Sequence, residues 1–290
     1  MQPKIRTEML KEGEIIPLTY DFMFTSIFNK EENIDILEEF VSFYLDIELN
    51  EVKGNLKLVS RDLELESKKE AGKKVDLLLD YKGKKINIEL SSNMSKGVTE
   101  RNVVFICRVH GGQLKYGDIH YKKLEQTIQI NLLSYKRNKG VVKDSYSLKN
   151  EKGELLSDRL IIDVIDMELG SELWYTEPTN KMYSWCKLFM SNNEAELEES
   201  RKYIMGRASG EKLDKEVKKL SQEDEMVYLY TKLSREELEK NTLIEEAKEQ
   251  GAYEKQKEMI IGMYENNIDI DKISAISNIS VEEIKNILGL

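Results

Sequence analysis

Residues 73–92 read KKVDLLLDYKGKKINIELSS, and this stretch decides the fold. Within it, residues 74–81 and 85–91 alternate apolar and polar side chains with a period of two, which is typical of strands with one buried face. Lys82 and Gly83 separate the two runs, so the stretch predicts a β-hairpin with a two-residue turn. Asp76 stands inside the apolar run VDLLL, where a carboxylate is costly unless a partner such as a divalent cation balances its charge.

The acidic residues of this hairpin resemble a known motif. Asp76 is followed about a dozen residues later by Glu89-Leu90-Ser91, an arrangement similar to the core of the PD-(D/E)XK nucleases. The surrounding sequence makes the resemblance narrower, because several segments occur in the order found in the Rpn family of recombination-promoting nucleases, also described as PD-(D/E)XK nuclease family transposases. These segments are LTYDFMFTSIF at residues 18–28, the hairpin, Gly112-Gln113-Leu114, Gly117, Tyr121 and IQINLLSY at residues 128–135. The resemblance extends from about residue 17 to about residue 135, and more loosely to the C-terminus.

The resemblance implies a fold, an activity and a metal site. The fold class is α+β, with a restriction-endonuclease-like core in which helices flank a mixed sheet. The activity is that of a metal-dependent DNA endonuclease, which hydrolyses phosphodiester bonds in recombination or mobile-element DNA. Asp76 and Glu89 would ligate Mg²⁺, or Mn²⁺ or Ca²⁺ in its place, and the backbone carbonyl of Leu90 would add an oxygen. In the wider superfamily an acid on the first helix can join the metal shell, which makes Glu38 or Glu39 a candidate.

Ser91 departs from the family pattern. The wider superfamily has lysine at this position and the Rpn group commonly has glutamine, whereas a serine hydroxyl carries no charge. Loss of one donor to the transition state commonly costs about two to three orders of magnitude in rate. Lys73, Lys74 or Arg101 are candidates to supply a replacement charge, and Ser91→Gln or Ser91→Lys is expected to raise a slow basal cleavage.

Two readings of the chain therefore stay open. The first is the enzyme, with Asp76, Glu89, Ser91 and Gln129 as catalytic candidates. Gln129 matches a glutamine typical of the family, and its amide would orient a phosphate or a water, or would only satisfy a neighbouring strand. The second reading is a catalytically degenerate nuclease fold that binds DNA or assembles with other proteins. Two acids retained in otherwise apolar strands favour the enzyme.

Composition restricts the classes of site and the location. The 290 residues, 40% of them hydrophobic, are enough for one domain and an extension. No run of eighteen apolar residues and no signal-like N-terminus occur, so we expect a cytoplasmic protein with no membrane partner. The two cysteines, Cys107 and Cys186, and the two histidines argue against a zinc site or a disulfide framework. Oxygen ligands are the remaining choice for a metal.

The charge of the chain is unevenly distributed. Although the net charge is −10, residues 60–145 contain 18 Lys and Arg against 11 Asp and Glu, a net charge of +7. This basic segment surrounds the acidic pair and predicts DNA as the partner, because a positive field attracts phosphodiesters. The expected phosphate contacts are Lys73, Lys74, Arg101, Arg108 and Lys115. The alternative is that the lysines only keep the hairpin soluble.

Periodicity outlines the remaining elements of the first domain, which we place at residues 1–182. Helices are expected within residues 20–45, strands at residues 56–65, 127–135 and 160–164, and a helix that begins at Thr99 as its N-cap. The result is a sheet of four or five strands with the hairpin at its centre. The helices within residues 20–45 are expected on one face, and the helix after Thr99 on the other.

Residues 183–290 are expected to form a helical C-terminal region that ends in a helical hairpin. Residues 268–276 and 281–288 have helix-turn-helix proportions, with Ser280 and Glu283 as a capping box. The second helix carries Lys285 against Glu282 and Glu283, which is unfavourable for DNA. Self-association or docking through these helices is therefore the preferred role.

Overall fold

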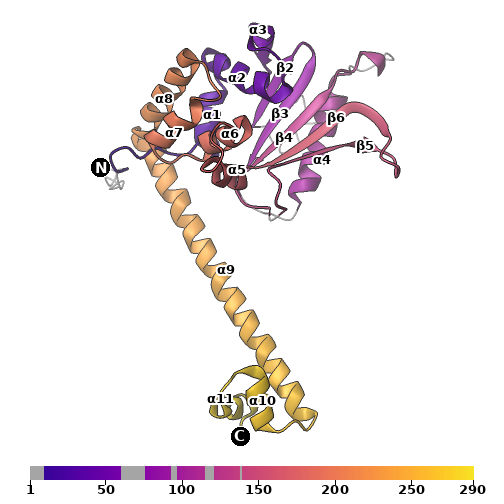
Figure 1. Ribbon diagram of the computed structural model, residues 1–290, viewed down its shortest axis with the longest axis vertical. Coiled ribbons are helices and arrows are strands. Elements are labelled where there is room, and N and C mark those ends of the chain that lie inside the picture. Colours follow the sequence, from indigo (N-terminus) through magenta and orange to yellow (C-terminus); the bar gives the residue numbers. More distant parts are fainter. Residues whose placement is uncertain (1–9, 60–75, 93–96, 115–120, 138) are drawn as a thin grey trace, which may run out of the picture. The chain divides into compact units, whose positions relative to one another are not determined.

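The sheet at the centre of the fold is mixed. The computed structural model describes residues 10–59, 76–92, 97–114, 121–137 and 139–290 (Figure 1). Within them, six strands form one sheet in the order β1-β2-β3-β4-β6-β5. They are β1 (Leu56–Leu58), β2 (Leu77–Tyr81), β3 (Lys84–Ser91), β4 (Thr127–Leu133), β5 (Lys143–Lys149) and β6 (Leu155–Asp166). The pairs β3–β4 and β4–β6 are parallel and the others antiparallel, which confirms the predicted mixed sheet and α+β class.

The predicted hairpin is present as β2 and β3. Tyr81 pairs with Lys84, and the two residues between them form the turn. Lys82 and Gly83 have φ of 50° and 92°, as a two-residue type I′ turn requires. Asp76 lies in the bend directly before β2, not inside the strand as the sequence predicts, and residues 74 and 75 lie outside the described part of the chain.

The two faces of the sheet pack against different helices. On one face, which we call the core face, Ile88 and Ile130 belong to a large apolar cluster that also contains residues of α1 (Asp21–Phe28), α2 (Ile34–Leu45) and α6 (Lys181–Met190). On the opposite face, which we call the α4 face, Leu78 packs against Val109 of α4 (Val98–Gly111). Figure 1 shows α4 and the pair α1 and α2 on different sides of the sheet, as predicted.

Some predicted boundaries were wrong. The sequence KDSYSLK of β5 shows no buried face, because β5 is an edge strand whose side chains are almost all exposed, and this strand was not predicted. β6 is longer than the predicted 160–164, because its first half pairs with this exposed edge strand. The N-cap of α4 is Gly97 with φ of 97°, not Thr99, because the left-handed backbone that precedes the helix suits glycine.

Further helices complete the first part of the chain. Their bounds are α3 (Leu49–Val52), α5 (Met167–Trp174), α7 (Glu194–Arg201) and α8 (Arg207–Ser221), with 3₁₀ turns at Glu31–Asn33 and Tyr121–Lys123. The chain divides into two compact units, Met1–Tyr230 and Thr231–Leu290. The first unit extends past residue 182, the boundary expected from composition, because Trp185 of α6 and Leu213 of α8 are buried in its apolar cluster.

The second unit is helical. It contains most of α9 (Asp224–Glu265) together with α10 (Ile270–Ser277) and α11 (Val281–Leu288). Ile260, Ile273 and Ile284 are buried together, and the hydroxyl of Ser280 accepts a hydrogen bond from the backbone N–H of Glu283 at 3.2 Å. This contact is the N-cap predicted at Ser280. In the part of the chain that the structure describes, no helix combines the length and the apolar character that spanning a bilayer requires.

Candidate active site

The two acids predicted from the sequence lie next to each other at the end of the hairpin. The backbone N–H of Asp76 donates to Oε1 of Glu89 at 3.3 Å, and the backbone N–H of Leu90 donates to Oδ2 of Asp76 at 2.8 Å. The carbonyl of Asp76 accepts from Nδ2 of Asn29, the residue that follows α1, at 3.1 Å. Contacts on both sides of its backbone therefore hold Asp76 beside Glu89 and Leu90.

Glu89 is a buried acid beside a second acid. Glu89 is only 3% exposed. Its burial, and to a smaller extent the negative charge of Asp76, raise the pKa of Glu89 to about 8. The side-chain amide of Asn87, the backbone N–H of Asp76 and the charge of Arg101 act in the opposite direction on this pKa. Two carboxylates that resist simultaneous ionisation form a site that a cation would stabilise. Among the described residues, no cluster of three or more His, Cys, Asp or Glu has metal-binding geometry.

A guanidinium from α4 lies beside Ser91, the residue at the position where the family motif has lysine or glutamine. Nη2 of Arg101, in the first turn of α4, donates to Oγ of Ser91 at 3.0 Å. Ser91 is buried on β3, two residues after Glu89, and Nε of Arg101 is buried with no partner among the described residues. The sequence left open whether Arg101 reaches the acids, and the structure places its positive charge beside the hydroxyl of Ser91.

Gln129 belongs to a row of buried amides on the α4 face. It accepts at Oε1 from Nδ2 of Asn87 at 2.7 Å and donates through Nε2 to Oδ1 of Asn131 at 3.0 Å. Asn87 also donates to Oε1 of Glu89 at 3.2 Å, so it lies between Gln129 and the acid. Sequence reasoning assigned no role to Asn87 and Asn131. Their positions on the polar side of two predicted strands were the available signal.

Of the five residues expected to contact phosphate, the structure describes two. Lys73, Lys74 and Lys115 lie outside the described residues, while Arg101 reaches the site and Arg108 is exposed further along α4. Three ion pairs of the basic segment with nearby acids reduce its positive field. These pairs are Lys85 with Asp80, Arg137 with Asp144, and Lys143 with Asp163.

The glutamates on the first helical segment are engaged elsewhere. Oε1 of Glu38 accepts from the backbone N–H of Gly54 at 2.8 Å. Oε1 of Glu39 accepts from the backbone N–H of Gly206 at 2.9 Å and from the hydroxyl of Ser209 at 2.8 Å. Both glutamates belong to α2, which packs on the core face, whereas Asp76 and Glu89 meet on the α4 face. The structure thus gives Glu38 and Glu39 structural contacts away from the acidic pair.

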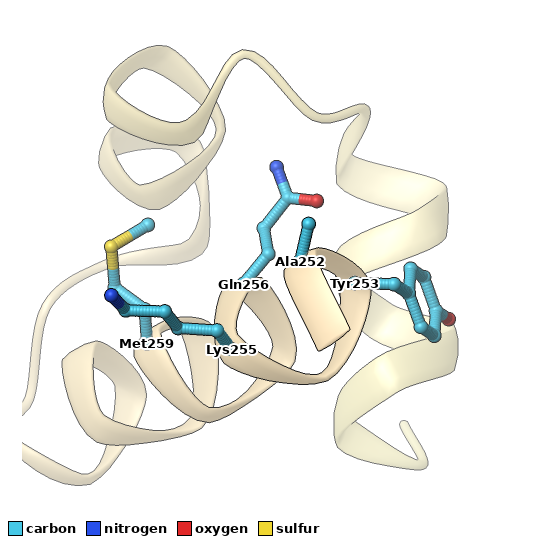
Figure 2. A pocket seen from close by; sticks show the side chains of 5 residues that line it. All are labelled: Ala252, Tyr253, Lys255, Gln256 and Met259. Carbon is cyan, nitrogen blue, oxygen red and sulfur yellow. The ribbon is translucent and has the colours of Figure 1, made fainter. Parts of the chain in front are cut away.

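The second unit carries a pocket of its own on α9. Figure 2 shows its lining, which consists of Ala252, Tyr253, Lys255, Gln256 and Met259. All five residues come from α9, and the pocket is open to solvent along this helix. Lys255 is the one charged residue of the lining, so the pocket offers none of the acids of the predicted site.

The fold and the site together define a class of protein. A mixed sheet with helices on both faces, and an Asp–Glu pair at the end of its hairpin, is the arrangement of a PD-(D/E)XK nuclease-like protein. The chain belongs to the PD-(D/E)XK nuclease family transposases, whose family model matches residues 18–278. This match confirms the resemblance found in the sequence and indicates a nuclease or mobile-element role. No curated protein and no solved structure matches the chain.

Proposed function

We propose that this protein is a metal-dependent endonuclease that hydrolyses phosphodiester bonds in DNA during recombination or mobile-element movement. One observation carries the proposal, the meeting of Asp76 and Glu89 on the α4 face, where Glu89 is buried and its pKa is raised. Burial of a glutamate beside a second acid is unfavourable for a fold that has no use for the pair. A divalent cation between them removes this cost.

The donor set suits a hard cation. Asp76 and Glu89 would hold it, and the carbonyl of Leu90 would be a third oxygen, since N–H and C=O of one strand residue point to the same side and the N–H of Leu90 faces Asp76. Mg²⁺ prefers oxygen ligands of this kind, and Mn²⁺ and Ca²⁺ are alternatives. When bound, the ion would supply a nucleophilic hydroxide near neutral pH and charge stabilisation at the phosphate.

Residues of the chain would position the DNA and stabilise developing charge. Arg101 would donate to the scissile phosphate, and Ser91 would orient its guanidinium through the 3.0 Å hydrogen bond. Arginine suits this task because its planar fork matches a phosphate and stays charged at every physiological pH. Arg108 on the same helix, with Lys73, Lys74 and Lys115, would contact the DNA backbone. The acids and the basic segment would thus act on one DNA substrate, which we expect in the cytoplasm.

A second reading keeps the fold and loses the chemistry. Ser91 in place of the motif lysine or glutamine favours it, because the family's usual donor is absent from that position. In this reading the protein binds DNA or assembles with other copies without cleaving. Self-association would use the terminal helices, where Ile276 is 61% exposed next to a small apolar cluster.

A plasmid-nicking assay with Mg²⁺, Mn²⁺, Ca²⁺ or chelator separates the two readings. We expect nicking by the wild type with Mg²⁺ or Mn²⁺, and none by Asp76→Ala or Glu89→Ala, although both variants should keep or slightly raise their melting temperature. Asp80→Ala is the matched control, because Asp80 is an acid of the same hairpin that pairs with Lys85 outside the site. If the wild type binds DNA but does not cleave it with any of the three metals, the enzyme reading is wrong and the binding reading stands.

A further inference from the structure

Three side-chain amides cross the α4 face of the sheet from one strand to the next. They belong to Asn87 on β3 and to Gln129 and Asn131 on β4, all 0% exposed, and we call them the amide ladder. The parallel register places Asn87 opposite Gln129 and Glu89 opposite Asn131. The ladder thus runs beside the acid that the proposed function assigns to the metal.

The far end of the ladder has a defined polarity. Nδ2 of Asn131 donates at 3.1 Å to the backbone carbonyl of Asp163 on β6, and a carbonyl can only accept. Asn131 must therefore turn its NH₂ toward Asp163 and its oxygen toward Gln129. Gln129 then donates to that oxygen at 3.0 Å, which turns its own oxygen toward Asn87. A backbone atom of β6 thus decides the orientation of two buried amides on β4.

The same constraint passes to Asn87. Because the oxygen of Gln129 faces it, Asn87 presents its NH₂ and donates at 2.7 Å to Gln129 and at 3.2 Å to Oε1 of Glu89. Asn87 therefore uses its NH₂ for two acceptors, and its buried Oδ1 has no partner among the described residues. A row of amides between two acceptors needs one amide that donates in both directions, and the oxygen of that amide, here Asn87, accepts from no other member of the row.

We propose that the amide ladder is a positioning device for Glu89, an inference that rests on the proposed metal site. The carbonyl of Asp163 sets, through Asn131 and Gln129, which edge of Asn87 faces the acid. The two hydrogen bonds described for Glu89, from Asn87 and from the backbone of Asp76, both end on Oε1. They hold the carboxylate by one oxygen and leave Oε2 to the cation.

This assignment changes the role of Gln129. Its described hydrogen bonds go to Asn87 and Asn131, so it acts on Glu89 through Asn87. Gln129 and Asn131 are therefore positioning residues, and their loss should weaken cation binding without removing a ligand. The effect expected for such an outer-sphere partner is about tenfold in metal affinity.

The test compares Asn131→Leu with Thr127→Val, using Ca²⁺ as a probe that avoids turnover. Thr127 is a matched control, because it is 0% exposed on the same face of β4 and bonds to His110 and Gln113 outside the ladder. Calorimetry should show about tenfold weaker Ca²⁺ binding for Asn131→Leu and near wild-type binding for Thr127→Val. Nitrogen-15 NMR of the side-chain NH₂ of Asn87 should show faster hydrogen exchange in Asn131→Leu alone, although the substitution lies two links away.

The outcomes separate the ladder from the metal. An unchanged NH₂ signal of Asn87 in Asn131→Leu overturns the ladder whatever the calorimetry gives. An altered signal with unchanged Ca²⁺ affinity overturns its positioning role. A wild type that binds neither Ca²⁺ nor Mg²⁺ contradicts the proposed function and the positioning role together, while the NH₂ signals still decide whether the amides are coupled. Gln129→Met, which conserves volume and breaks the row next to Asn87, replaces Asn131→Leu if that variant does not fold.

Discussion

Nη2 of Arg101 lies 3.0 Å from the hydroxyl oxygen of Ser91, so α4 supplies a cation beside the strand position that follows the acidic pair. A serine is short enough to leave room for that guanidinium, whereas a lysine on β3 would occupy the same space with its own charge. The departure from the family motif is thus accompanied by a charge from another element.

Arg101→Ala should lower the single-turnover rate of DNA cleavage by about two to three orders of magnitude, because it removes a donor at the developing phosphate charge. Arg101→Lys should retain part of the activity, since the charge stays and the planar fork is lost. Arg108→Ala is the comparison variant on the same helix. It should raise the DNA concentration at which cleavage reaches half its maximal rate and leave the rate at saturating DNA unchanged. Equal loss in both alanine variants would contradict the role of Arg101.

Ser91→Lys should not raise cleavage in the wild-type background, because the new ammonium would crowd the guanidinium of Arg101. In the Arg101→Ala background the same substitution should raise cleavage, since a lysine then stands alone at the motif position. The sequence by itself led to a different expectation, a gain in the wild type. Rates of the four proteins, measured as a double-mutant cycle, decide between the two expectations.

The stability of the metal-free protein should depend on pH through Glu89. Its pKa is raised in the folded state from 4.5 to about 8, so the folded protein holds a proton that the unfolded chain releases in this range. The free energy of unfolding should therefore be highest below pH 4.5, as far as this group contributes, and should fall as the pH rises toward 8. Urea unfolding at several pH values in this range, with a chelator present, measures this pH dependence. The substitution Glu89→Gln should make the free energy of unfolding nearly independent of pH over the same range. Added Mg²⁺ should restore stability at the alkaline end.

Most of the fold could be predicted from period-two alternation and from the hairpin turn. The hairpin and β4 were found because their buried faces are continuous, and the acids were found because carboxylates interrupt apolar strands. The strand β5 was not predicted, because an exposed edge strand has no apolar face that the sequence pattern could reveal. The contact between Arg101 and Ser91 could not be predicted, because it depends on how α4 packs on the sheet. Sequence spacing does not specify which side chains of two packed elements meet.

DNA binding should be non-specific and should weaken steeply as salt concentration rises, because phosphate contacts release counterions. Arg108→Glu should reduce the affinity several-fold at low salt and make the salt dependence shallower. Fluorescence anisotropy with a labelled duplex measures both quantities. Lys85→Glu is the control, because it makes the same change of charge at the turn end of the hairpin, away from the acids. DNA binding that does not change with salt concentration would contradict the prediction that the basic segment attracts DNA.

The terminal helices should act in self-association and not in cleavage. Ile276→Asp should lower the mass seen by sedimentation, because it places a charge on an exposed apolar position of α10. Asn286→Asp adds the same charge on an exposed position of α11 and should leave the mass unchanged. Deletion of residues 268–290 should have the effect of Ile276→Asp while nicking persists. Loss of nicking with unchanged mass would instead indicate a DNA-reading role.

The amides of β3 and β4 also bear on how the chain chooses its pairing. A slip of one residue between these parallel strands would place Asn87 opposite Ile128 or Ile130, and would leave buried N–H groups without acceptors. Alternative registers are therefore disfavoured during assembly of the sheet, and a slip of one residue would also turn Ile128 and Ile130 of β4 away from the core face. The polar groups of the site thus lower the stability of competing folds, so that specificity of folding and placement of the acid depend on the same three side chains.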